Sequence, residues 1–340
     1  MAKPAGNIEP KPMRWDAQKD AVERDVITGA AVLKLSGVTR TVRTPEFAGI
    51  EFHEVESKSA LTKVPETSRM PFRWTINPYR GCTMGCRYCF ARSTHEYLGL
   101  NSGPDFDQQI IVKTNIVQAL DQELRRKRTW KRELVALGSN TDPYQRAEGR
   151  YQLMPGIIQT LAAHDTPFSI LTKSSLIRRD IPLLKAARER VDISISMSIA
   201  IFDESLRELM EPGAPKAEAR LETVRLLTNA GFDVTVFLMP IIPFLLDSAE
   251  HLERAMELIA SSGAKAVMHG VMHLRPGALE SIQAWVRTHR PELGPQFEKL
   301  YGRSSNAPVE YRRRISETVH VLAHKYGLHS LDDADQPLGQ

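Results

Sequence analysis

From Phe72 onward, short runs of β-branched and other apolar residues alternate with longer stretches in which apolar positions recur every three or four residues. The short runs predict buried strands and the longer stretches predict amphipathic helices. Their alternation is typical of strand–helix units around a parallel sheet. Six strands are expected, at residues 72–76, 133–138, 168–172, 191–199, 233–239 and 265–274.

The stretch from Asn115 to Lys127 shows the helical pattern most clearly, with Ile116, Leu120 and Leu124 on one face behind Asn115 as a candidate cap. Each connection between strands is long enough for a helix. Six units are fewer than the eight of a TIM barrel, so we expect a partial (β/α)6 barrel. Its chemistry belongs at the C-terminal ends of the strands.

The remaining segments flank this core. Residues 1–67 are polar and predict an N-terminal extension, with one alternating piece at residues 38–42 that can add a strand. We expect residues 68–290 to form the core domain and residues 291–340 a C-terminal helical tail. The helical segment from Val309 to Tyr326 is expected to cap the bottom of the barrel.

Charge and hydropathy exclude little beyond membrane insertion. The 45 basic and 41 acidic residues leave a net charge of +4, which does not by itself predict nucleic-acid binding. The first residues contain no apolar leader, and the longest apolar stretch, from Phe237 to Leu246, is about half a membrane span and is broken by two prolines. We therefore expect a cytoplasmic protein without a membrane partner, and the oligomeric state stays open.

The chain has only three cysteines, Cys82, Cys86 and Cys89, in a C-x3-C-x2-C arrangement just after the first strand. An odd number within eight positions does not suit a disulfide framework, so these thiols are candidate metal ligands. Four thiolates normally satisfy a [4Fe–4S] cluster, and three leave one iron open for a second ligand such as S-adenosylmethionine (SAM). The alternative is a zinc site completed by a histidine such as His95.

The cysteine segment, with an aromatic residue at Tyr88, resembles the hallmark motif of the radical SAM superfamily. Within it, the chain is most similar to the group related to spore photoproduct lyase, over roughly residues 70–290. The supporting phrases are residues 77–81 (Asn-Pro-Tyr-Arg-Gly), 141–145 (Thr-Asp-Pro-Tyr-Gln), 171–174 (Leu-Thr-Lys-Ser) and 211–212 (Glu-Pro). The resemblance implies a reduced cluster that cleaves SAM to a 5′-deoxyadenosyl radical. It also implies a reductant such as flavodoxin or ferredoxin, and DNA as a candidate partner.

Residues that would hold SAM are expected at strand ends. Lys173 follows the third strand and matches the lysine that photoproduct lyases use for the SAM carboxylate; a solvated lysine is the alternative. Ser196 is the candidate on the fourth strand, where three alternating serines share one face. Pro240 lies in an apolar stretch that cannot continue the fifth strand and suits an adenine slot, although core packing explains it as well. Tyr88 and Thr141 complete the cofactor-binding candidates.

Ser139, Asp142 and Tyr144 are the catalytic candidates after the second strand. Thr141, Asp142 and Tyr144 are expected to face the active mouth together, while a turn before Pro143 is the alternative role of Asp142. Ser139 stands where the lyase has a hydrogen-donating cysteine. A hydroxyl is a poorer hydrogen-atom donor than a thiol, so the lyase's hydrogen-return step is not expected in the same form.

Two basic runs and several histidines are further candidates. The runs Arg125–Arg128, with Lys131 and Arg132, and Arg312–Arg314 can contact phosphates or simply be solvated helix faces. His269 and His273 share a face of the sixth strand, where an inward role or a hydrogen-bonded core role is open. The leading hypothesis is a radical SAM enzyme acting on DNA or another nucleobase-containing substrate. The alternatives are modification of a protein or metabolite, and a zinc-stabilised nucleic-acid adaptor.

Overall fold

All six predicted strands are present in one eight-stranded sheet of the computed structural model, which describes residues 24–25, 38–68, 70–127 and 130–332. The six strands are β5 (Trp74–Ile76), β8 (Val135–Leu137), β9 (Phe168–Thr172), β10 (Ile193–Ser198), β11 (Val234–Ile241) and β12 (Ala266–Val271). Neighbours among them are parallel and follow chain order. Their C-terminal ends therefore meet along one edge of the sheet, where the site is expected.

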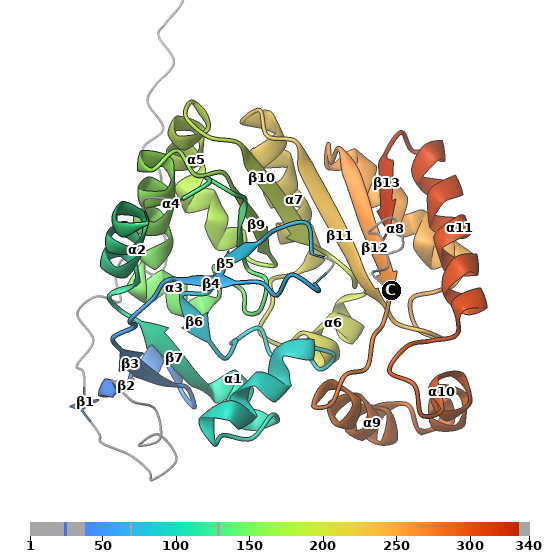
Figure 1. Ribbon diagram of the computed structural model, residues 1–340. Helices are drawn as coiled ribbons and strands as arrows, with labels where there is room; N and C mark the ends of the chain where they lie inside the picture. Colours follow the sequence, from blue (N-terminus) through green and yellow to red (C-terminus); the bar gives the residue numbers. More distant parts are fainter. Residues whose placement is uncertain (1–23, 26–37, 69, 128–129, 333–340) are drawn as a thin grey trace, which may run out of the picture.

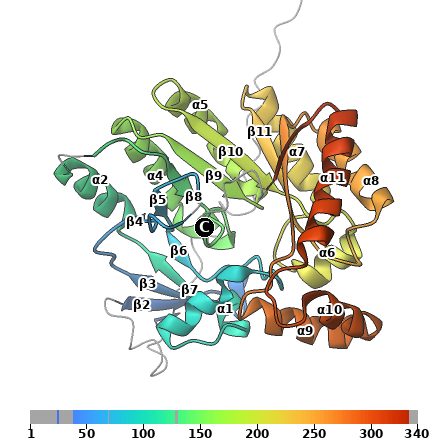
Figure 2. The same ribbon diagram turned by 45° about the vertical axis from the view of Figure 1, so that its right-hand side comes forward.

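Two further strands lie at the ends of this sheet. β4 (Leu61–Lys63) pairs antiparallel with β5, and β13 (His329–Asp332) pairs parallel with β12. These two end strands are not paired with each other, so the sheet is curved and open rather than a closed barrel (Figures 1 and 2).

Helices cover the outer face of the sheet (Figure 1). They include α2 (Ile116–Arg126), α4 (Leu153–Ala163), α5 (Ile181–Arg188), α7 (Ala217–Asn229) and α8 (Ala249–Ser261). In α2, the predicted apolar positions Ile116, Leu120 and Leu124 are buried. Asn115 does stand at the helix start, but its side chain makes no cap hydrogen bond and instead pairs with the backbone of Ser57. The predicted helix is confirmed and the predicted cap is wrong, because a tertiary contact takes the side chain.

A second, five-stranded sheet lies beside the first strands of the main sheet. It comprises β1 (Arg24–Asp25), β2 (Val38–Arg43), β3 (Glu51–Val55), β7 (Gln109–Lys113) and β6 (Tyr79–Arg80). The strand predicted at residues 38–42 is β2. β3 pairs with β7, which pairs with β6, and β6 leads directly into the cysteine segment. The N-terminal residues thus help to position the strand that precedes the candidate site.

The C-terminal part contributes α9 (Ala278–His289), α10 (Gly294–Tyr301) and α11 (Val309–Lys325). α11 matches the helix predicted from Val309 to Tyr326, but it lies along α8, β12 and β13 instead of across the bottom of the strands (Figure 1). The expected cap of the barrel is therefore wrong: the helix's buried residues, which include Val319 and Ala323, cover the last strands of the open sheet.

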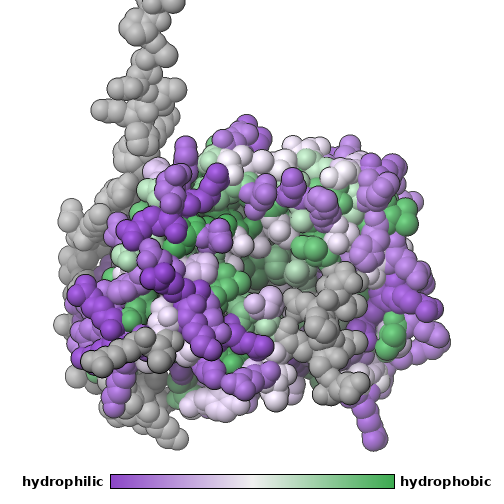
Figure 3. All heavy atoms as spheres, turned by 45° about the horizontal axis from the view of Figure 1, so that its top comes forward, coloured by the Kyte–Doolittle hydropathy of each residue, from purple (hydrophilic) through white to green (hydrophobic). Residues whose placement is uncertain are grey.

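The short elements are η3 (Pro45–Phe47), η4 (Phe90–Leu98), α1 (Pro104–Gln108), α3 (Arg146–Tyr151), η5 (Ser175–Asp180), α6 (Glu204–Met210) and η6 (Pro291–Leu293). Hydrophilic side chains dominate the rim of the face in Figure 3, and apolar residues are visible between them. No helix in the described ranges has both the length and the apolar composition to span a membrane.

Candidate active site

The three cysteines lie in one loop between β6 and η4. Cys82 and Cys86 are buried and Cys89 is partly buried, and all three are free thiols. Gly81 precedes the loop with φ of +78°, and a Cβ there would stand 2.9 Å from the Gln109 carbonyl oxygen. Only glycine combines this backbone conformation with such a close approach, so the loop's path depends on that residue.

Gln145 fixes the loop from the side of β8. Its side-chain oxygen accepts a hydrogen bond from the Thr83 backbone N–H at 2.9 Å, and its side-chain nitrogen donates to the Gly81 carbonyl at 3.0 Å. Thr141 donates through its hydroxyl to the Tyr79 carbonyl at 2.9 Å. The segment after β8 is therefore bonded directly to the backbone around the cysteines.

Arg92 fixes the loop from within η4. Its side chain is only 1% exposed, and its Nε donates to the Cys86 carbonyl at 3.0 Å. The rest of the guanidinium donates to the carbonyls of Ser102 and Gly103 and forms an ion pair with Asp107 at 2.9 Å. A planar group with five donors satisfies all of these acceptors at once.

The turn after α6 supports the loop from a third side. The Gly213 N–H donates to the Met84 carbonyl at 3.0 Å, and the Arg87 N–H donates to the Met210 carbonyl at 2.9 Å. A Cβ at Gly213 would lie 1.9 Å from the Thr83 carbonyl oxygen. This turn and the cysteine loop are therefore in direct backbone contact.

A buried charge cluster connects the cysteine loop with the ends of β9 and β10. Lys173 Nζ lies 3.1 Å from Glu211 Oε1 and donates to Ser198 Oγ at 2.7 Å. The other Glu211 oxygen lies 2.7 Å from Arg220, and the Tyr88 hydroxyl donates to Glu211. Burial alone would raise the pKa of Glu211, but the charges of Arg220 and Lys173 outweigh it and lower the pKa to about 2. Glu211 is therefore ionised and holds the lysine beside Tyr88.

Burial raises the pKa of all three thiols, that of Cys86 to about 12, and the charge of Lys173 acts in the opposite direction on Cys86. Thiols bind metal only as thiolates, so ligation here requires a group that supplies positive charge. Iron supplies it, and three thiols on one glycine-containing loop are the donor set of an iron–sulfur cluster with one open position. The residues present fit such a cluster.

His95, the alternative zinc ligand, is buried beside this loop. Its Nε2 hydrogen-bonds the Gln109 carbonyl at 2.9 Å, and its ring contacts Phe106 edge to face. Within the ranges that the structure describes, no three His, Cys, Asp or Glu side chains converge as ligands of a single metal ion. Measurement of iron, sulfide and zinc in the purified protein distinguishes the zinc alternative from the cluster.

The candidates after β8 have different surroundings. Asp142 accepts hydrogen bonds from the Thr172 hydroxyl at 2.7 Å and from the Lys173 N–H at 2.6 Å, which fixes the start of the Lys173 segment. It also accepts from the Tyr144 N–H, the local turn contact that was its alternative role. Ser139 is partly buried at the end of β8.

Tyr144 departs from the expectation that it faces the mouth with Thr141 and Asp142. Its side chain is 0% exposed, and its hydroxyl donates to Asp180 at 3.0 Å. The phenol is held by a neighbouring segment, because a buried hydroxyl needs a hydrogen-bond partner.

The serine row on β10 has the predicted alternation. Ser196 is partly buried and Ser198 is buried, while Ile195 and Met197 between and beside them pack into the core. Pro240 is partly buried, but β11 continues to Ile241 through an irregular register. The expectation that this stretch cannot continue the strand is therefore wrong, because the irregular register accommodates a residue without an N–H.

The basic runs are largely engaged with their own surroundings. Arg125 pairs with Asp121, and Lys127 pairs with Glu123 and lies 4.0 Å from the Trp74 ring centre. Arg128 lies outside the described residues. In the second run, Arg312 donates to the Ala307 carbonyl, Arg313 pairs with Glu317, and Arg314 lies over the Tyr311 ring.

The two histidines near β12 have different surroundings. His269 Nε2 hydrogen-bonds Ser316 on α11 at 3.0 Å, on the outer face of the sheet. His273 hydrogen-bonds Asn306 and Arg275 beyond the strand's end. The inward role is therefore wrong for His269, and the hydrogen-bonded core role describes it.

Sequence reasoning missed four residues that organise the site: Gln145, Arg92, Glu211 and Arg220. Gln145 and the Glu211-Pro212 pair were part of the motif phrases, but no role followed from their positions. Arg220 did carry a signal, because it lies in phase with the buried Ala217 and Val224 on the apolar face of α7. Arg92 carried none that separates it from a surface arginine.

Comparisons with known proteins identify relatives in sequence and a similar fold. An uncharacterized protein of Mycobacterium tuberculosis is 48% identical over 318 residues, 93% of each chain. An uncharacterized protein of Methanocaldococcus jannaschii is 28% identical over 201 residues, 58% of this chain and 70% of that protein. The fold is similar to that of spore photoproduct lyase complexed with dinucleoside spore photoproduct, with a TM-score of 0.60 and 14% identity over 83% of this chain and 82% of that chain.

The model of the radical SAM superfamily matches residues 76–259, from the strand before the cysteines into α8. That span is more than half of the chain, which therefore belongs to the radical SAM superfamily.

Proposed function

We propose that Cys82, Cys86 and Cys89 hold a [4Fe–4S] cluster and that the protein uses SAM to start radical chemistry on a nucleobase-containing substrate. When bound and reduced, the cluster supplies the electron that cleaves SAM to methionine and the 5′-deoxyadenosyl radical. The observation that carries this proposal is a buried link between the cysteine loop and Lys173. The Tyr88 hydroxyl donates to Glu211, and Glu211 Oε1 lies 3.1 Å from Lys173 Nζ.

Lys173 is the proposed partner of the SAM carboxylate. It follows β9 at the C-terminal edge of the sheet, and its side chain is 14% exposed, so its ammonium is largely shielded from water. An ion pair gains strength where water is excluded. Ser198 and Glu211 hold the ammonium in place ahead of SAM binding, and Ser196 lies on the same face of β10 as Ser198.

The substrate class rests on the likeness to spore photoproduct lyase, whose structures contain a dinucleoside spore photoproduct. At 14% identity this likeness concerns the fold, so the substrate is a proposal for this chain. Asp142 and Ser139 lie at the end of β8, on the same edge of the sheet as Lys173. A peptide or metabolite substrate is the competing outcome of the experiments below.

The test begins with anaerobic reconstitution and measurement of iron, sulfide and zinc. We expect about four irons and four sulfides per chain and dithionite-dependent formation of 5′-deoxyadenosine from SAM. Replacing Cys82, Cys86 and Cys89 together with alanine should abolish both cluster and cleavage. Stoichiometric zinc without sulfide, or undiminished cleavage in the triple variant, would overturn the assignment.

Lys173→Gln tests the SAM site separately from the cluster. We expect its affinity for SAM to fall roughly tenfold, as for loss of one charge-assisted contact, while its iron and sulfide content stays at the wild-type level. Lys185→Gln removes an exposed lysine of α5 and serves as the control. Equal SAM affinity in the two variants would refute the role of Lys173.

A further inference from the structure

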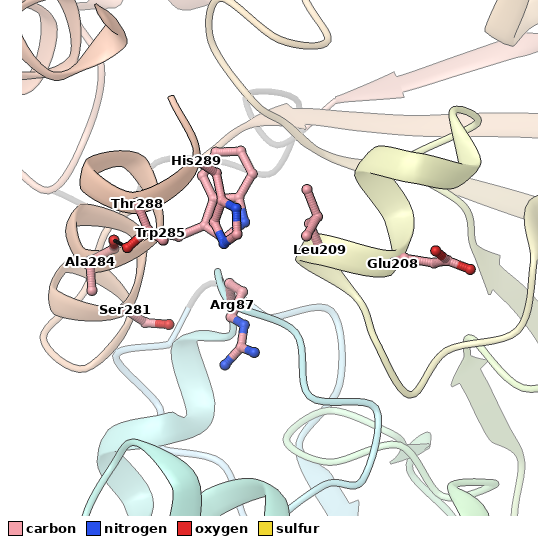
Figure 4. Close-up of a pocket in the computed structure, with 8 residues that line it drawn as sticks. All are labelled: Arg87, Glu208, Leu209, Ser281, Ala284, Trp285, Thr288 and His289. Carbon is pink, nitrogen blue, oxygen red and sulfur yellow. Dashed lines mark hydrogen bonds between the residues drawn. The ribbon is translucent and has the colours of Figure 1, made fainter. Parts of the chain in front are cut away.

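A cavity of about 320 Å³ lies against the outer side of the cysteine loop. It is bounded by α9, by the end of α6, and by Arg87, which stands between Cys86 and Tyr88. The rings of Trp285 and His289 project from α9 into the space between Leu209 and Arg87 (Figure 4). Arg87 is bonded through its backbone to Met210, so the cavity and the cysteine loop share one backbone contact.

The polar groups that line this cavity differ in their partners. Trp285 is 5% exposed, and its Nε1 is buried with no hydrogen-bond acceptor among the described residues. Among the described residues, no carboxylate forms an ion pair with Arg87 and no acceptor bonds its guanidinium. The charge of Arg87 lowers the pKa of Asp107, whereas burial raises it. A buried N–H without an acceptor is costly, so the Trp285 N–H is suited to an acceptor from outside the chain.

The surroundings of the cavity are mainly positive and partly apolar. His289 lies with its ring centre 5.4 Å from that of Trp285, and Arg287 is exposed on the same helix. Arg290, just after α9, pairs with Glu292 at 3.6 Å. Leu209 is 41% exposed beside them. Among the described residues that line the cavity, Glu208 is the one carboxylate; its side chain is 63% exposed and lies 3.5 Å from Arg207.

We propose that this face, made of Arg87, Leu209, Trp285 and His289, is the docking surface for an acidic one-electron carrier protein, one carboxylate of which enters the cavity. The Trp285 N–H is the donor for that carboxylate, and charge complementarity with Arg87 and Arg287 selects an acidic partner.

This inference rests on the proposed function, because it assigns the face to the reductant of the cluster. A carrier docked here touches Arg87, which directly follows the proposed ligand Cys86. One electron passes from the reduced carrier, which is oxidised by one electron, to the cluster, which is reduced by one; no other reactant is needed.

Ala284→Glu and its neighbour Gln283→Glu test the surface with a matched pair of charge changes. Both residues are exposed on α9, but only Ala284 lines the cavity. The probe is a bacterial flavodoxin, reduced by NADPH and its reductase. We expect Ala284→Glu to weaken flavodoxin binding about tenfold, as for a like charge placed in an interface. Gln283→Glu should bind as the wild type does, and wild-type affinity should fall as salt is raised.

SAM cleavage supplies the second measurement. Flavodoxin-driven cleavage at limiting flavodoxin should fall in Ala284→Glu by the same factor, whereas cleavage driven by dithionite, a small reductant, should be unchanged. Equal flavodoxin binding by the two variants would overturn the docking proposal. So would an Ala284→Glu variant that binds flavodoxin normally but no longer binds single-stranded DNA. Absence of dithionite-driven cleavage in the wild type would instead refute the proposed function, and the binding comparison would still decide the docking surface.

Discussion

Glu211 and Arg220 form an ion pair with Oε2 and Nη2 2.7 Å apart, and both side chains are 0% exposed. The remaining donors of Arg220 bond the carbonyls of Pro215 and Ser198. The pair therefore joins the turn that contacts the cysteine loop to the end of β10. Charges buried to this extent are tolerated only when each has a partner.

Glu211→Gln should destabilise the protein because it leaves the Arg220 charge without a carboxylate. We expect the free energy of unfolding to fall by about 3 to 5 kcal/mol, measured by urea titration of the metal-free protein. Glu222→Gln is the matched control. It breaks the exposed pair between Glu222 and Arg225 on α7, the helix that also holds Arg220, and little change in the free energy of unfolding is expected. Equal midpoints for the two variants would contradict a stabilising role of the buried pair.

The same pair predicts a pH dependence. The pKa of Glu211 is lowered to about 2, below the ordinary value of 4.5, so its contribution is fully present above the ordinary value. It is lost as the pH falls from there toward the lowered value, because the native state must then bind a proton that it resists. The stability advantage of the wild type over Glu211→Gln should therefore shrink between these two pH values. An advantage constant from pH 6 to pH 3 would show that Glu211 does not titrate as inferred.

The main sheet was predictable because its strands are short runs rich in β-branched and apolar residues, as in residues 133–138, and they alternate with longer stretches of helical periodicity. In the second sheet β2 was predicted, but β3 was not. β3 reads Glu-Phe-His-Glu-Val, and its polar residues pair with partners distant in sequence: His53 hydrogen-bonds Gln109, and Glu54 pairs with Arg40. Local pattern does not reveal such pairings.

The candidate site was likewise predictable only in part. The cysteine loop was recognisable because its three ligands lie within eight residues, and Lys173 because it directly follows a strand. Arg92 and Gln145 act on the loop through hydrogen bonds to backbone carbonyls and N–H groups, which are the same for every residue type. Only the folded path of the chain shows which backbone groups they reach.

Gly213→Ala should displace the cysteine loop, because the added Cβ would lie 1.9 Å from the Thr83 carbonyl oxygen and 3.0 Å from the Met84 Cα. Both are backbone atoms, so no side-chain rotation relieves the contact. We expect cluster content after reconstitution to fall at least severalfold, together with the temperature of unfolding. Gly294→Ala is the control, since a Cβ there meets nothing within 4 Å. If Gly213→Ala retains wild-type iron and sulfide, the turn does not set the loop's position.

Ser139→Cys tests the substrate proposal through the hydrogen that must return to the product. In the lyase that this chain resembles, a cysteine fills this position, and a thiol donates a hydrogen atom far more readily than a hydroxyl. Ser139 is partly buried at the end of β8, three residues before Asp142, whose backbone hydrogen-bonds the Cys82 thiol. With DNA that contains the spore photoproduct, we expect the wild type to form 5′-deoxyadenosine but little repaired thymine, and Ser139→Cys to form severalfold more thymine per SAM cleaved. Ser175→Cys, which adds a thiol in η5, is the control.

Rapid, complete repair by the wild type would show that another group donates the hydrogen. No repair by Ser139→Cys, despite SAM cleavage, would favour a substrate other than the photoproduct.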